Sequence, residues 1–550
     1  MAYYGIDLGT SSCLAARLEE GFEPGEFSLR CLHDAEGEES FPSVISFRDD
    51  KDYLVGEKAQ ERLLSDPDST VELVKLRLGK KNTISVLIDG KWQEKSPQEI
   101  TALLLKHLNS YREGGLQNPV LTVPAFFDQS QKDATMQASK LAETTVAQLI
   151  EEPTAAVMYQ IFDDYQRLGT DFFEVKSAKN VLVFDFGGGT LDLSLIRLTL
   201  ENDEVKPDVL AVHGDSDLGG NGIDFVFTQQ VLDRLSRENP QSAFISQAKR
   251  AFDDYFENYK ENNILLFPDD ASLEVKSFVF RLKRETERVK ISLSSRDREK
   301  IFVGREFSAI YITRDEFEKL VFDHSDLDER IQEAIQSILK KAWGQPIHEV
   351  LLVGGSSQIP YVQGAVLESL QEVHVKEDAI RVSSDYSHAV AMGAAIQAAL
   401  IAGVSVKPFH KNKCTSVLPR DILLEFGKSR TVIAESGTPY PFEQEKTLRF
   451  SIPHALSDSV PLKMMEKMED SSGRSSEKLI CDYRFYLPLY YTGDEMQISL
   501  NIDSAGLYQV QATHIPTKES VEFESHKSFS LSRKEFEDAS ARIASMKEMS

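Results

Sequence analysis

The sequence predicts a layered α/β fold with two related lobes, followed by a small all-β domain. Strand-like and helix-like segments alternate through the first part of the chain, as is typical of α/β layers. One pattern, an apolar strand, an Asp, a glycine-rich turn and a second strand, occurs twice, at Ile6–Leu18 and at Phe184–Leu198. After Val406 the segments become short and β-like. The repeated pattern predicts that each lobe contributes one hairpin to a common cleft.

Composition narrows the functional class. The chain has 550 residues, and 62 Lys and Arg against 88 Asp and Glu give a net charge of −26. Phosphate backbones and anionic membranes repel such a chain at long range, which argues against a dedicated nucleic-acid or membrane binder. Apolar residues make up 41%, enough for large cores. The four cysteines, Cys13, Cys31, Cys414 and Cys481, form no disulfide framework and favour a reducing compartment.

The chain shows no targeting or membrane segment by its sequence pattern. The N-terminus lacks the basic and apolar regions of a signal peptide, so a cytoplasmic location is predicted. The longest apolar stretch, Ala389–Val406, approaches the length of a membrane span. It is rich in Ala and Gly and carries Gln397 near its middle, which favours a tightly packed buried helix.

The elements of the α/β part are predicted in chain order. Ala2–Leu8 and Ser12–Glu19 are apolar enough for buried strands. A helix through His107 should start after Ser96, because Ser96 is a good cap and Pro97 fits the first helical position. The other predictions are strands at Pro119–Pro124, Val181–Phe186, Leu191–Leu200 and Glu349–Val353, and helices at Ser130–Thr144 and Gln332–Lys341.

The C-terminal part is predicted to be a linker, an all-β domain and one helix. Lys407–Cys414 is polar and basic and contains a proline, which predicts a linker. Short β-like segments from Thr415 to Glu524 are separated by turn sequences. Ser532 and Glu535 form a capping-box pair, and apolar residues at helical spacing follow, so we expect a helix over Ser532–Met549. The predicted boundaries are 1–403 for the α/β domain, 404–414 for the linker, 415–525 for the β domain and 526–550 for the helix.

The repeated turns predict a phosphate site. Glycine lets the backbone approach a phosphate and direct amides at it, and Thr hydroxyls add donors. An Asp before each turn, Asp7 or Asp185, can hold Mg²⁺ through water. Ordinary β-turns are the alternative, which the pairing of two such turns makes the weaker one. The turn residues are Gly9, Thr10 and Ser11, then Gly187, Gly188, Gly189 and Thr190, with a third turn at Gly354, Gly355 and Ser356 and a weaker fourth at Gly219 and Gly220.

Nine motifs in order give the sequence a specific resemblance. The motifs are GIDLGT, FPSVISF, VPAFFDQSQKDAT, EEPTAA, FDFGGGTLD, DLGGN, ERVKISLSS, LLVGGSSQIP and AVAMGAAIQAA. Together they resemble the seventy-kilodalton heat-shock chaperones of the DnaK type. The resemblance implies an α/β, actin/hexokinase-like two-lobed ATPase domain, then an all-β sandwich that binds peptides, and a short C-terminal helix as a remnant of the family's lid.

The resemblance also implies roles for individual residues. Asp7 and Asp185 would position hydrated Mg²⁺ and the γ-phosphate, with Asp185 also a candidate proton acceptor. Lys75 would stabilise the attacking water and the departing phosphoryl charge, and Glu152 would lie near the water shell of the metal. Thr190 and Asp192 would support the second turn, and the adenosine side would be formed by Glu287, Lys290, Ser294, Gly354, Gly355, Ser356 and Gln358.

Several positions depart from the family pattern. Two arginines that normally sandwich adenine are replaced by Ile291 and Gln358, and Ser387 stands where an Asp is usual, so weaker nucleotide binding is expected. The linker is polar and basic, although Pro124 is present and Lys132 replaces an arginine. Coupling between the two domains and a flexible tether therefore both stay open. The remaining helix is short enough to cover one edge of a peptide cleft without closing it.

These observations favour an ATP-dependent chaperone-like protein that hydrolyses Mg-ATP slowly and binds extended apolar peptide segments. ATP or ADP and Mg²⁺ are the implied cofactors, with K⁺ left open. The resemblance implies a J-domain co-chaperone and a nucleotide-exchange factor as partners. The main alternative is a scaffold of the same fold that binds nucleotide weakly and docks a dedicated protein, and a small-molecule kinase is a more remote one. The histidines show no metal-ligand spacing, so no transition-metal site is predicted.

Overall fold

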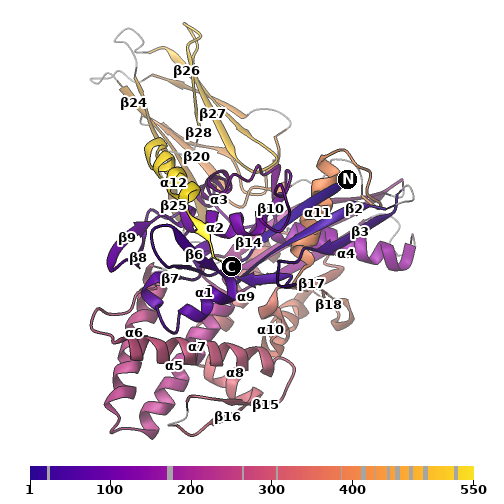
Figure 1. Cartoon of the computed structure of the whole chain (residues 1–550). Helices are drawn as coiled ribbons and strands as arrows, with labels where there is room; N and C mark the ends of the chain where they lie inside the picture. Colours follow the sequence, from indigo (N-terminus) through magenta and orange to yellow (C-terminus); the bar gives the residue numbers. More distant parts are fainter. Residues whose placement is uncertain are drawn as a thin grey trace.

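The structure is a computed structural model in which a mixed α/β part is joined to a β-rich part and a C-terminal helix (Figure 1). It describes all residues except 22–24, 170–177, 203, 263–264, 305–306, 343, 374, 384, 386, 410–415, 428, 443–445, 453–458, 470–474, 487–492, 525–530 and 550.

The first sheet is built around the predicted N-terminal hairpin. Its strand order is β11-β10-β1-β2-β3, with β4 also paired to β2. β1 runs antiparallel to β2 and parallel to β10, and β10 runs parallel to β11. The parallel strands are buried, as expected where both faces are covered. Their bounds are β1 Ala2–Leu8, β2 Ser12–Glu20, β3 Phe27–Cys31, β4 Ser40–Pro42, β10 Val120–Val123 and β11 Gln148–Glu151.

The second sheet repeats this topology. Its order is β14-β13-β12-β17-β18, with an antiparallel hairpin β12–β13 and parallel neighbours β17 and β18. β12 therefore takes the place of β1, and the turn after β12 takes the place of the turn after β1. The predicted internal repeat is confirmed as a repeat of strand order. The bounds are β12 Ala178–Phe186, β13 Leu191–Glu201, β14 Glu204–Asp215, β17 Glu349–Val353 and β18 Ile380–Val382.

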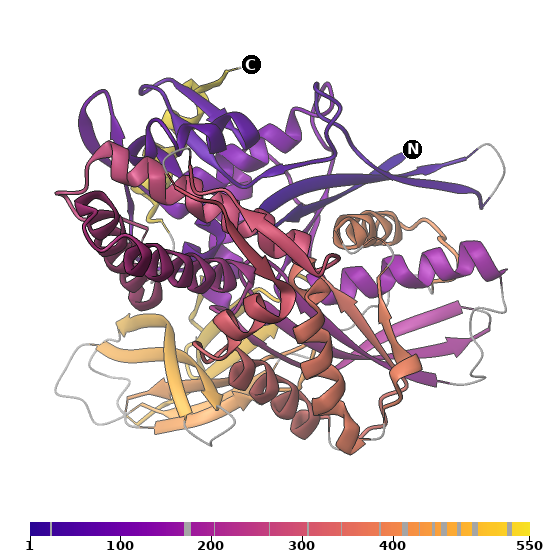
Figure 2. The same cartoon turned by 90° about the horizontal axis from the view of Figure 1, so that it is seen from below.

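Two helices, α4 (Glu152–Leu168) and α11 (Ala389–Ile401), pack side by side between the sheets (Figure 2). A Cβ built on Gly393 of α11 would lie 1.7 Å from the carbonyl oxygen of Ala155, so only glycine permits this approach. Gln397 is buried and donates to Gln148 Oε1 at 3.0 Å. The apolar stretch that begins at Ala389 is therefore a buried helix, as predicted, and the described residues contain no helix that is both long and apolar enough to cross a membrane.

Smaller elements complete the region around the first sheet. Ser96 caps α2, as predicted, and forms a capping box with Glu99, and α3 begins with a capping box of Asp128 and Gln131. The predicted start of α3 at Ser130 was wrong because Asp128 provides the cap, and the helix ends at Leu141 rather than Thr144. The elements are β5 Ile45–Phe47, β6 Asp52–Val55, α1 Gly56–Arg62, β7 Thr70–Val71, β8 Ile84–Ile88, β9 Lys91–Lys95, α2 Pro97–Asn109 and α3 Gln129–Leu141.

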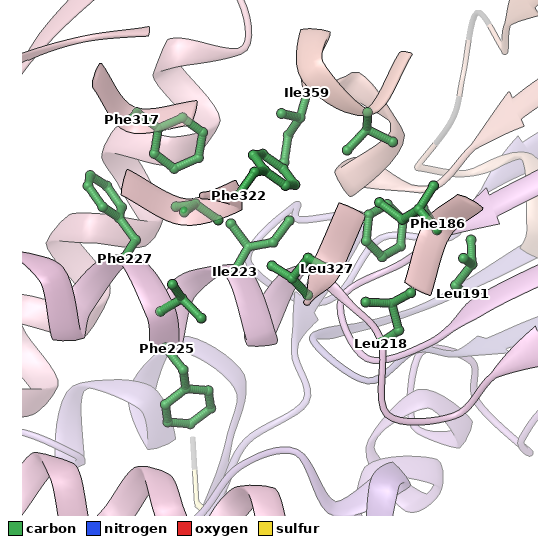
Figure 3. Packing of buried hydrophobic residues seen from close by; sticks show 14 of the residues in the cluster. Phe186, Leu191, Leu218, Ile223, Phe225, Phe227, Phe317, Phe322, Leu327 and Ile359 are labelled. Carbon is green, nitrogen blue, oxygen red and sulfur yellow. The ribbon is translucent and has the colours of Figure 1, made fainter. Parts of the chain in front are cut away.

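Helices and a small hairpin surround the second sheet. A large apolar cluster, in which Phe186 and Leu191 of the sheet lie near Leu218, Ile223 and Leu327, anchors both ends of the turn between β12 and β13 (Figure 3). α9 starts five residues before its predicted start at Gln332. The elements are α5 Gly220–Glu238, α6 Ala243–Asn262, α7 Leu273–Leu293, β15 Arg298–Ile301, β16 Ile310–Thr313, α8 Arg314–Phe322, α9 Leu327–Lys341 and α10 Pro360–Leu370.

Two four-stranded antiparallel sheets enclose one apolar core in the C-terminal part. Their orders are β21-β20-β24-β25 and β23-β26-β27-β28, and a short pair β19–β22 joins them. The bounds are β19 Ser416–Val417, β20 Asp421–Phe426, β21 Ser429–Ala434, β22 Pro439–Tyr440, β23 Lys446–Ser451, β24 Ser459–Glu469, β25 Ser475–Tyr486, β26 Glu495–Ile502, β27 Tyr508–His514 and β28 Ser520–Glu524.

The segment before this β-rich part is docked where the structure describes it. Phe409 is buried and forms an isolated parallel bridge with Val205, whose amide donates to the carbonyl of Pro408 at 2.6 Å. Residues 406–409 thus pack along β14. The rest of the predicted linker, including Cys414, lies outside the described residues.

The C-terminal helix differs from its prediction in length and in place. α12 (Arg533–Ser545) has the predicted Ser532–Glu535 capping box, but Met546 is extended, so the helix stops before Met549. Ala539 and Ile543 pack into the core beneath the first sheet, beside α2 and α3 (Figure 1). The sequence left room for this helix to cover one edge of a peptide cleft, whereas its apolar face is buried on the α/β part.

Polar contacts hold α12 and the residues after it. Arg542 pairs with Glu99 of α2 at 2.6 Å, and Lys106 donates to the carbonyls of Ile543 and Met546, both at 3.1 Å. β29 (Lys547–Glu548) then pairs in parallel with β6. Lys106 donates to carbonyls at the end of α12, which are acceptors that a further helical turn would otherwise satisfy.

Candidate active site

The two repeated glycine turns face one another. A Cβ built on Gly188 would lie 2.1 Å from Ser11 Oγ, and one on Gly189 would lie 2.5 Å from Thr10 Oγ1. Asn221, at the start of α5, donates to Ser11 Oγ at 3.3 Å and to the Gly188 carbonyl at 2.6 Å. A side chain at either position would displace Ser11 or Thr10, so glycine favours this approach of turns from separate sheets.

Ionisable side chains gather beneath the turns, at the ends of β1, β12 and β13 and at the first residue of α4. Lys75 Nζ lies 2.5 Å from Glu152 Oε1, and both groups are buried. Thr122 Oγ1 donates to Asp7 Oδ1 at 3.0 Å. Asp185 and Asp192 are buried on neighbouring strands at paired positions. The predicted residues Asp7, Lys75, Glu152 and Asp185 therefore form one cluster.

The carboxyl groups of this cluster are held in an unfavourable environment. Burial, reinforced by the charge of Glu152, raises the pKa of Asp7 to about 7 and that of Asp192 to about 7, and raises the pKa of Asp185 well above its usual range. Burial alone would lower the pKa of Lys75, but the charges of Glu152 and Asp7 outweigh it, so Lys75 stays an ammonium.

The cluster fits a hard divalent cation. Four carboxyl groups share the site with Lys75, so ionised carboxylates would carry an excess of negative charge. Mg²⁺ prefers oxygen ligands and keeps much of its water shell, so carboxylates arranged around a cleft suit it. The donor chemistry thus matches the Mg²⁺ that the sequence predicts at Asp7 and Asp185.

Lys75 is placed by an unusual backbone. It lies in a short 3₁₀ turn, Val74–Arg77, which follows Leu73 at a φ of 57°. A left-handed conformation costs a non-glycine residue roughly 1–2 kcal/mol. Leu73 is also buried, so core packing holds it in this left-handed conformation. Lys75, two residues later, is thereby directed into the cluster.

A second set of predicted residues meets beside the turns. Ser356 Oγ donates to the Gly187 carbonyl at 2.9 Å, and the Gly220 amide donates to the same carbonyl at 3.0 Å. Lys290 of α7 donates to the Gly220 carbonyl at 3.2 Å and pairs with Asp224 at 2.7 Å. The turns at 187–190, 219–220 and 354–356 are therefore joined through α5 and α7.

The remaining predicted nucleotide residues are not drawn into this network. Ser294 Oγ donates within its own helix, to the Lys290 carbonyl at 3.3 Å, and Gln358 Nε2 donates to its neighbour Ser357 at 3.4 Å. Glu287 has a partly exposed side chain on α7. Ile291 is 63% exposed, an uncommon position for a large apolar residue.

A contact with the β-rich part was missed by the sequence analysis. The Phe126 amide donates to Asp192 Oδ1 at 3.0 Å. On the other side of Phe126, Arg420 donates to its carbonyl at 2.9 Å and stacks over its ring at 4.2 Å. Glu466 of β24, buried and 3.6 Å from Arg420, accepts the amide of Gln129 at 3.2 Å. One residue, Phe126, thus links the acidic cluster to the β-rich part.

Glu466 could have been noticed in the sequence. Leu462, Met464 and Glu466 alternate along one strand and share a face, so a charged residue occupies a core-facing position. A buried carboxylate needs partners, and these come from Arg420, Gln129 and Tyr508, whose hydroxyl donates at 3.0 Å. Lys132, which the sequence analysis noted, also reaches this interface and donates to Tyr440 at 3.1 Å.

His213, next to this interface, should make the stability of the fold sensitive to acid. Its ring lies 5.3 Å from that of Phe126, and burial, with the charges of Lys341 and Arg420, lowers its pKa to about 3. The unfolded chain takes up the proton near pH 6.5, so His213 stabilises the fold fully above that pH, and this contribution is lost as the pH falls toward 3. Between pH 7.5 and pH 5 we expect His213 to lower the free energy of unfolding of the wild type by up to about 2 kcal/mol. The variant His213→Gln should not show this decrease.

Urea denaturation of both proteins at pH 7.5 and pH 5 checks this. The control is His324→Gln, because His324 is exposed at the end of α8. An equal loss of stability in wild type and His213→Gln would contradict the prediction.

Comparison with known proteins decides the family. A sequence model of the family described as Hsp70 protein matches residues 3–253 and 251–549. The chain belongs to the Hsp70 family. A relative, the chaperone protein DnaK of Thermosipho melanesiensis, is 33% identical over 413 residues, which cover 72% of this Hsp70 and 59% of the relative. The matched part thus spans less than two thirds of that curated relative.

Proposed function

We propose that this Hsp70 is an ATP-dependent chaperone-like protein that hydrolyses Mg-ATP slowly and binds extended apolar peptide segments. The observation that carries the proposal is the buried cluster of Asp7, Lys75, Glu152 and Asp185 beneath two facing glycine turns. Family membership supports it, because Hsp70 proteins are ATPases that bind ATP or ADP with Mg²⁺. The scaffold alternative has no comparable support.

The proposed architecture divides the chain into four parts. Residues 1–403 form a two-lobed, actin-like ATPase domain around the two repeated sheets, and 404–414 connect it to a β-sandwich at 415–525 that binds peptide. The last part, 526–550, contains the short C-terminal helix α12. The repeated strand order supports two lobes, and the apolar core shared by two four-stranded sheets supports the sandwich.

The residues of the cluster have separate roles in the proposed hydrolysis. Asp7 and Asp185 hold hydrated Mg²⁺, which when bound neutralises phosphate charge. Lys75 stabilises the attacking water and the charge on the transferred phosphoryl group, and Glu152 fixes the Lys75 ammonium at 2.5 Å. Asp185 accepts the proton of the water. Backbone amides of the turns and Thr190 hold the phosphate oxygens.

The assay for this function is single-turnover hydrolysis of labelled ATP by the purified chain. We expect Mg²⁺-dependent, near-stoichiometric conversion to ADP, because positioning and charge neutralisation supply most of the catalysis in such sites. Absence of turnover at saturating ATP would contradict the enzymatic proposal and favour a scaffold.

Nucleotide affinity should be limited by the adenosine side. Ile291 and Gln358 lack the guanidinium that stacks on a purine ring, so each Arg introduced there should gain roughly 0.5–2 kcal/mol. Ile291→Arg with Gln358→Arg should therefore strengthen ADP binding about tenfold or more and slow its release. Calorimetric titration measures the affinity, and stopped-flow release of a fluorescent ADP measures the rate.

The control for that experiment is Val382→Arg, since Val382 is another exposed apolar residue, on β18. Submicromolar ADP affinity of the wild-type protein would contradict the premise that these replacements weaken binding.

Family membership further supports a J-domain co-chaperone and a nucleotide-exchange factor as partners, a cytoplasmic location and K⁺ as an additional ion. These remain parts of the proposal and are tested by adding such partners and ions to the ATPase assay.

A further inference from the structure

Three side chains meet at the edge of the first sheet, and a fourth, that of His33, lies beside them. Cys31 ends β3, Glu39 precedes β4, and His388 precedes α11. The ligating atoms of Cys31, Glu39 and His388 all lie within 4.8 Å of one another. His33 adds a second imidazole, with Nε2 3.7 Å from Glu39 Oε1. Cys31 is buried, with 3% of its surface exposed.

The two imidazoles are oriented in the same way. His33 Nδ1 lies 3.1 Å from the Gly37 carbonyl, and His388 Nδ1 lies 2.5 Å from Asp385 Oδ1. A carbonyl or carboxylate oxygen can only accept, so Nδ1 carries the proton in both rings. In the neutral rings Nε2 therefore presents a lone pair, and both Nε2 atoms face the Glu39 carboxylate, at 3.7 Å and 3.3 Å.

A lone pair that faces a carboxylate is repelled unless a positive charge lies between them. If both rings were protonated, each imidazolium would pair with the Glu39 carboxylate. Such pairs would not explain why the buried thiol of Cys31 lies beside them. A metal ion accounts for all of these groups. Metal-bound histidines typically donate their other ring nitrogen to a carboxylate or a carbonyl, which is the arrangement of His388 and His33.

We propose that Cys31, Glu39 and His388 bind one Zn²⁺ ion, with His33 at the fourth position. Thiolate, imidazole and carboxylate together suit zinc, whereas Mg²⁺ and Ca²⁺ prefer oxygen ligands alone. Zn–S of about 2.3 Å and Zn–N of about 2.0 Å place tetrahedral ligand atoms roughly 3.5 Å apart. The atoms of Cys31, Glu39 and His388, now within 4.8 Å of one another, therefore close by up to about 1.3 Å when the ion binds. Binding releases the Cys31 proton to solvent.

The site would join two parts of the fold. Cys31 and Glu39 belong to the first sheet, whereas His388 lies in the connection from β18 of the second sheet to α11. Bound zinc would therefore fix this connection against the first sheet. Cys31, His33 and Glu39 lie within nine residues, but His388 is far away in the sequence, so spacing alone gave no complete set of ligands.

Zinc titration of the untagged full chain, stripped with a chelator and kept in excess Mg²⁺, tests the proposal. A chromophoric competitor should report one tight equivalent of Zn²⁺. Cys31→Ser and His388→Ala should each weaken binding at least tenfold, and Asp385→Asn by roughly 10–100-fold, because Asp385 orients His388. The matched controls Cys481→Ser, in the β-rich part, and His324→Ala, on the surface, should bind as wild type does.

Cobalt provides a second readout that does not depend on affinity. Co²⁺ in the site should show thiolate-to-metal charge-transfer absorption in wild type and in Cys481→Ser, and none in Cys31→Ser. Circular dichroism establishes that each variant is folded. Absence of the tight equivalent, or the same affinity in Cys31→Ser and His388→Ala as in wild type, would overturn the proposal and assign the cluster to imidazolium–carboxylate pairs.

Discussion

Lys75→Ala should slow single-turnover ATP hydrolysis roughly 10²–10³-fold, the cost of removing one preorganised charge donor from a transition state. Lys75 is buried at 2.5 Å from Glu152, and its ammonium is kept charged by Glu152 and Asp7. Without it, four carboxyl groups would face the phosphates with no ammonium at this position. The effect should fall on the rate of the chemical step rather than on the amount of nucleotide bound at saturation.

The matched control is Lys179→Ala. Lys179 pairs with Glu349 at 2.5 Å at the opposite end of β12 from Asp185, about 20 Å along the strand. Its replacement should leave the single-turnover rate within about twofold of wild type. Equal rates for wild type and Lys75→Ala would show that the cluster does not hydrolyse ATP, and the scaffold alternative would then stand.

Arg420→Met should abolish the effect of ATP on peptide release. Arg420 joins Glu466 of the β-rich part to Phe126, whose amide is bound to Asp192 in the acidic cluster. Arg420→Met removes a charge-assisted hydrogen bond and a cation–π contact with Phe126, together worth roughly 2–5 kcal/mol, which should weaken docking of the β-rich part more than tenfold. Fluorescence anisotropy of a labelled apolar peptide should show faster dissociation with Mg-ATP in wild type and an unchanged rate in Arg420→Met.

Arg430→Met is the control for this experiment. Arg430 pairs with Glu477 on an exposed face of the same sheet, so its loss should leave the response to ATP intact. If ATP does not change the dissociation rate even in wild type, the β-rich part is an uncoupled tether. If Arg420→Met responds as wild type does, coupling runs through other contacts.

Local chemistry made much of the fold predictable. β1 and the caps of α2 and α12 follow from apolar runs and from Ser–Glu pairs three residues apart, which act within one turn of chain. The strand repeat identified Asp7 and Asp185 as partners. Lys75 had no local signal and came from the family resemblance alone.

Contacts between distant segments were not predictable in this way. The apolar face of α12 indicates that something covers Ile543, but α2 and the β-rich part are equally apolar candidates. The link from Asp192 through Phe126 to Arg420 depends on a backbone amide, which no side-chain pattern reveals. Residues 406–409 looked like a polar linker, yet Phe409 is among the most buried side chains.

The pairing of β29 with β6 affects the order in which the protein can be completed during synthesis. Lys547 and Glu548 leave the ribosome 495 residues after their partners Asp52 and Tyr53. At a synthesis rate of about 5–20 residues per second, one edge of β6 stays unpaired for roughly 25–100 s before β29 is made. Such an edge can pair with other chains. The sheet that contains β6 is thus completed long after β6 itself has been made.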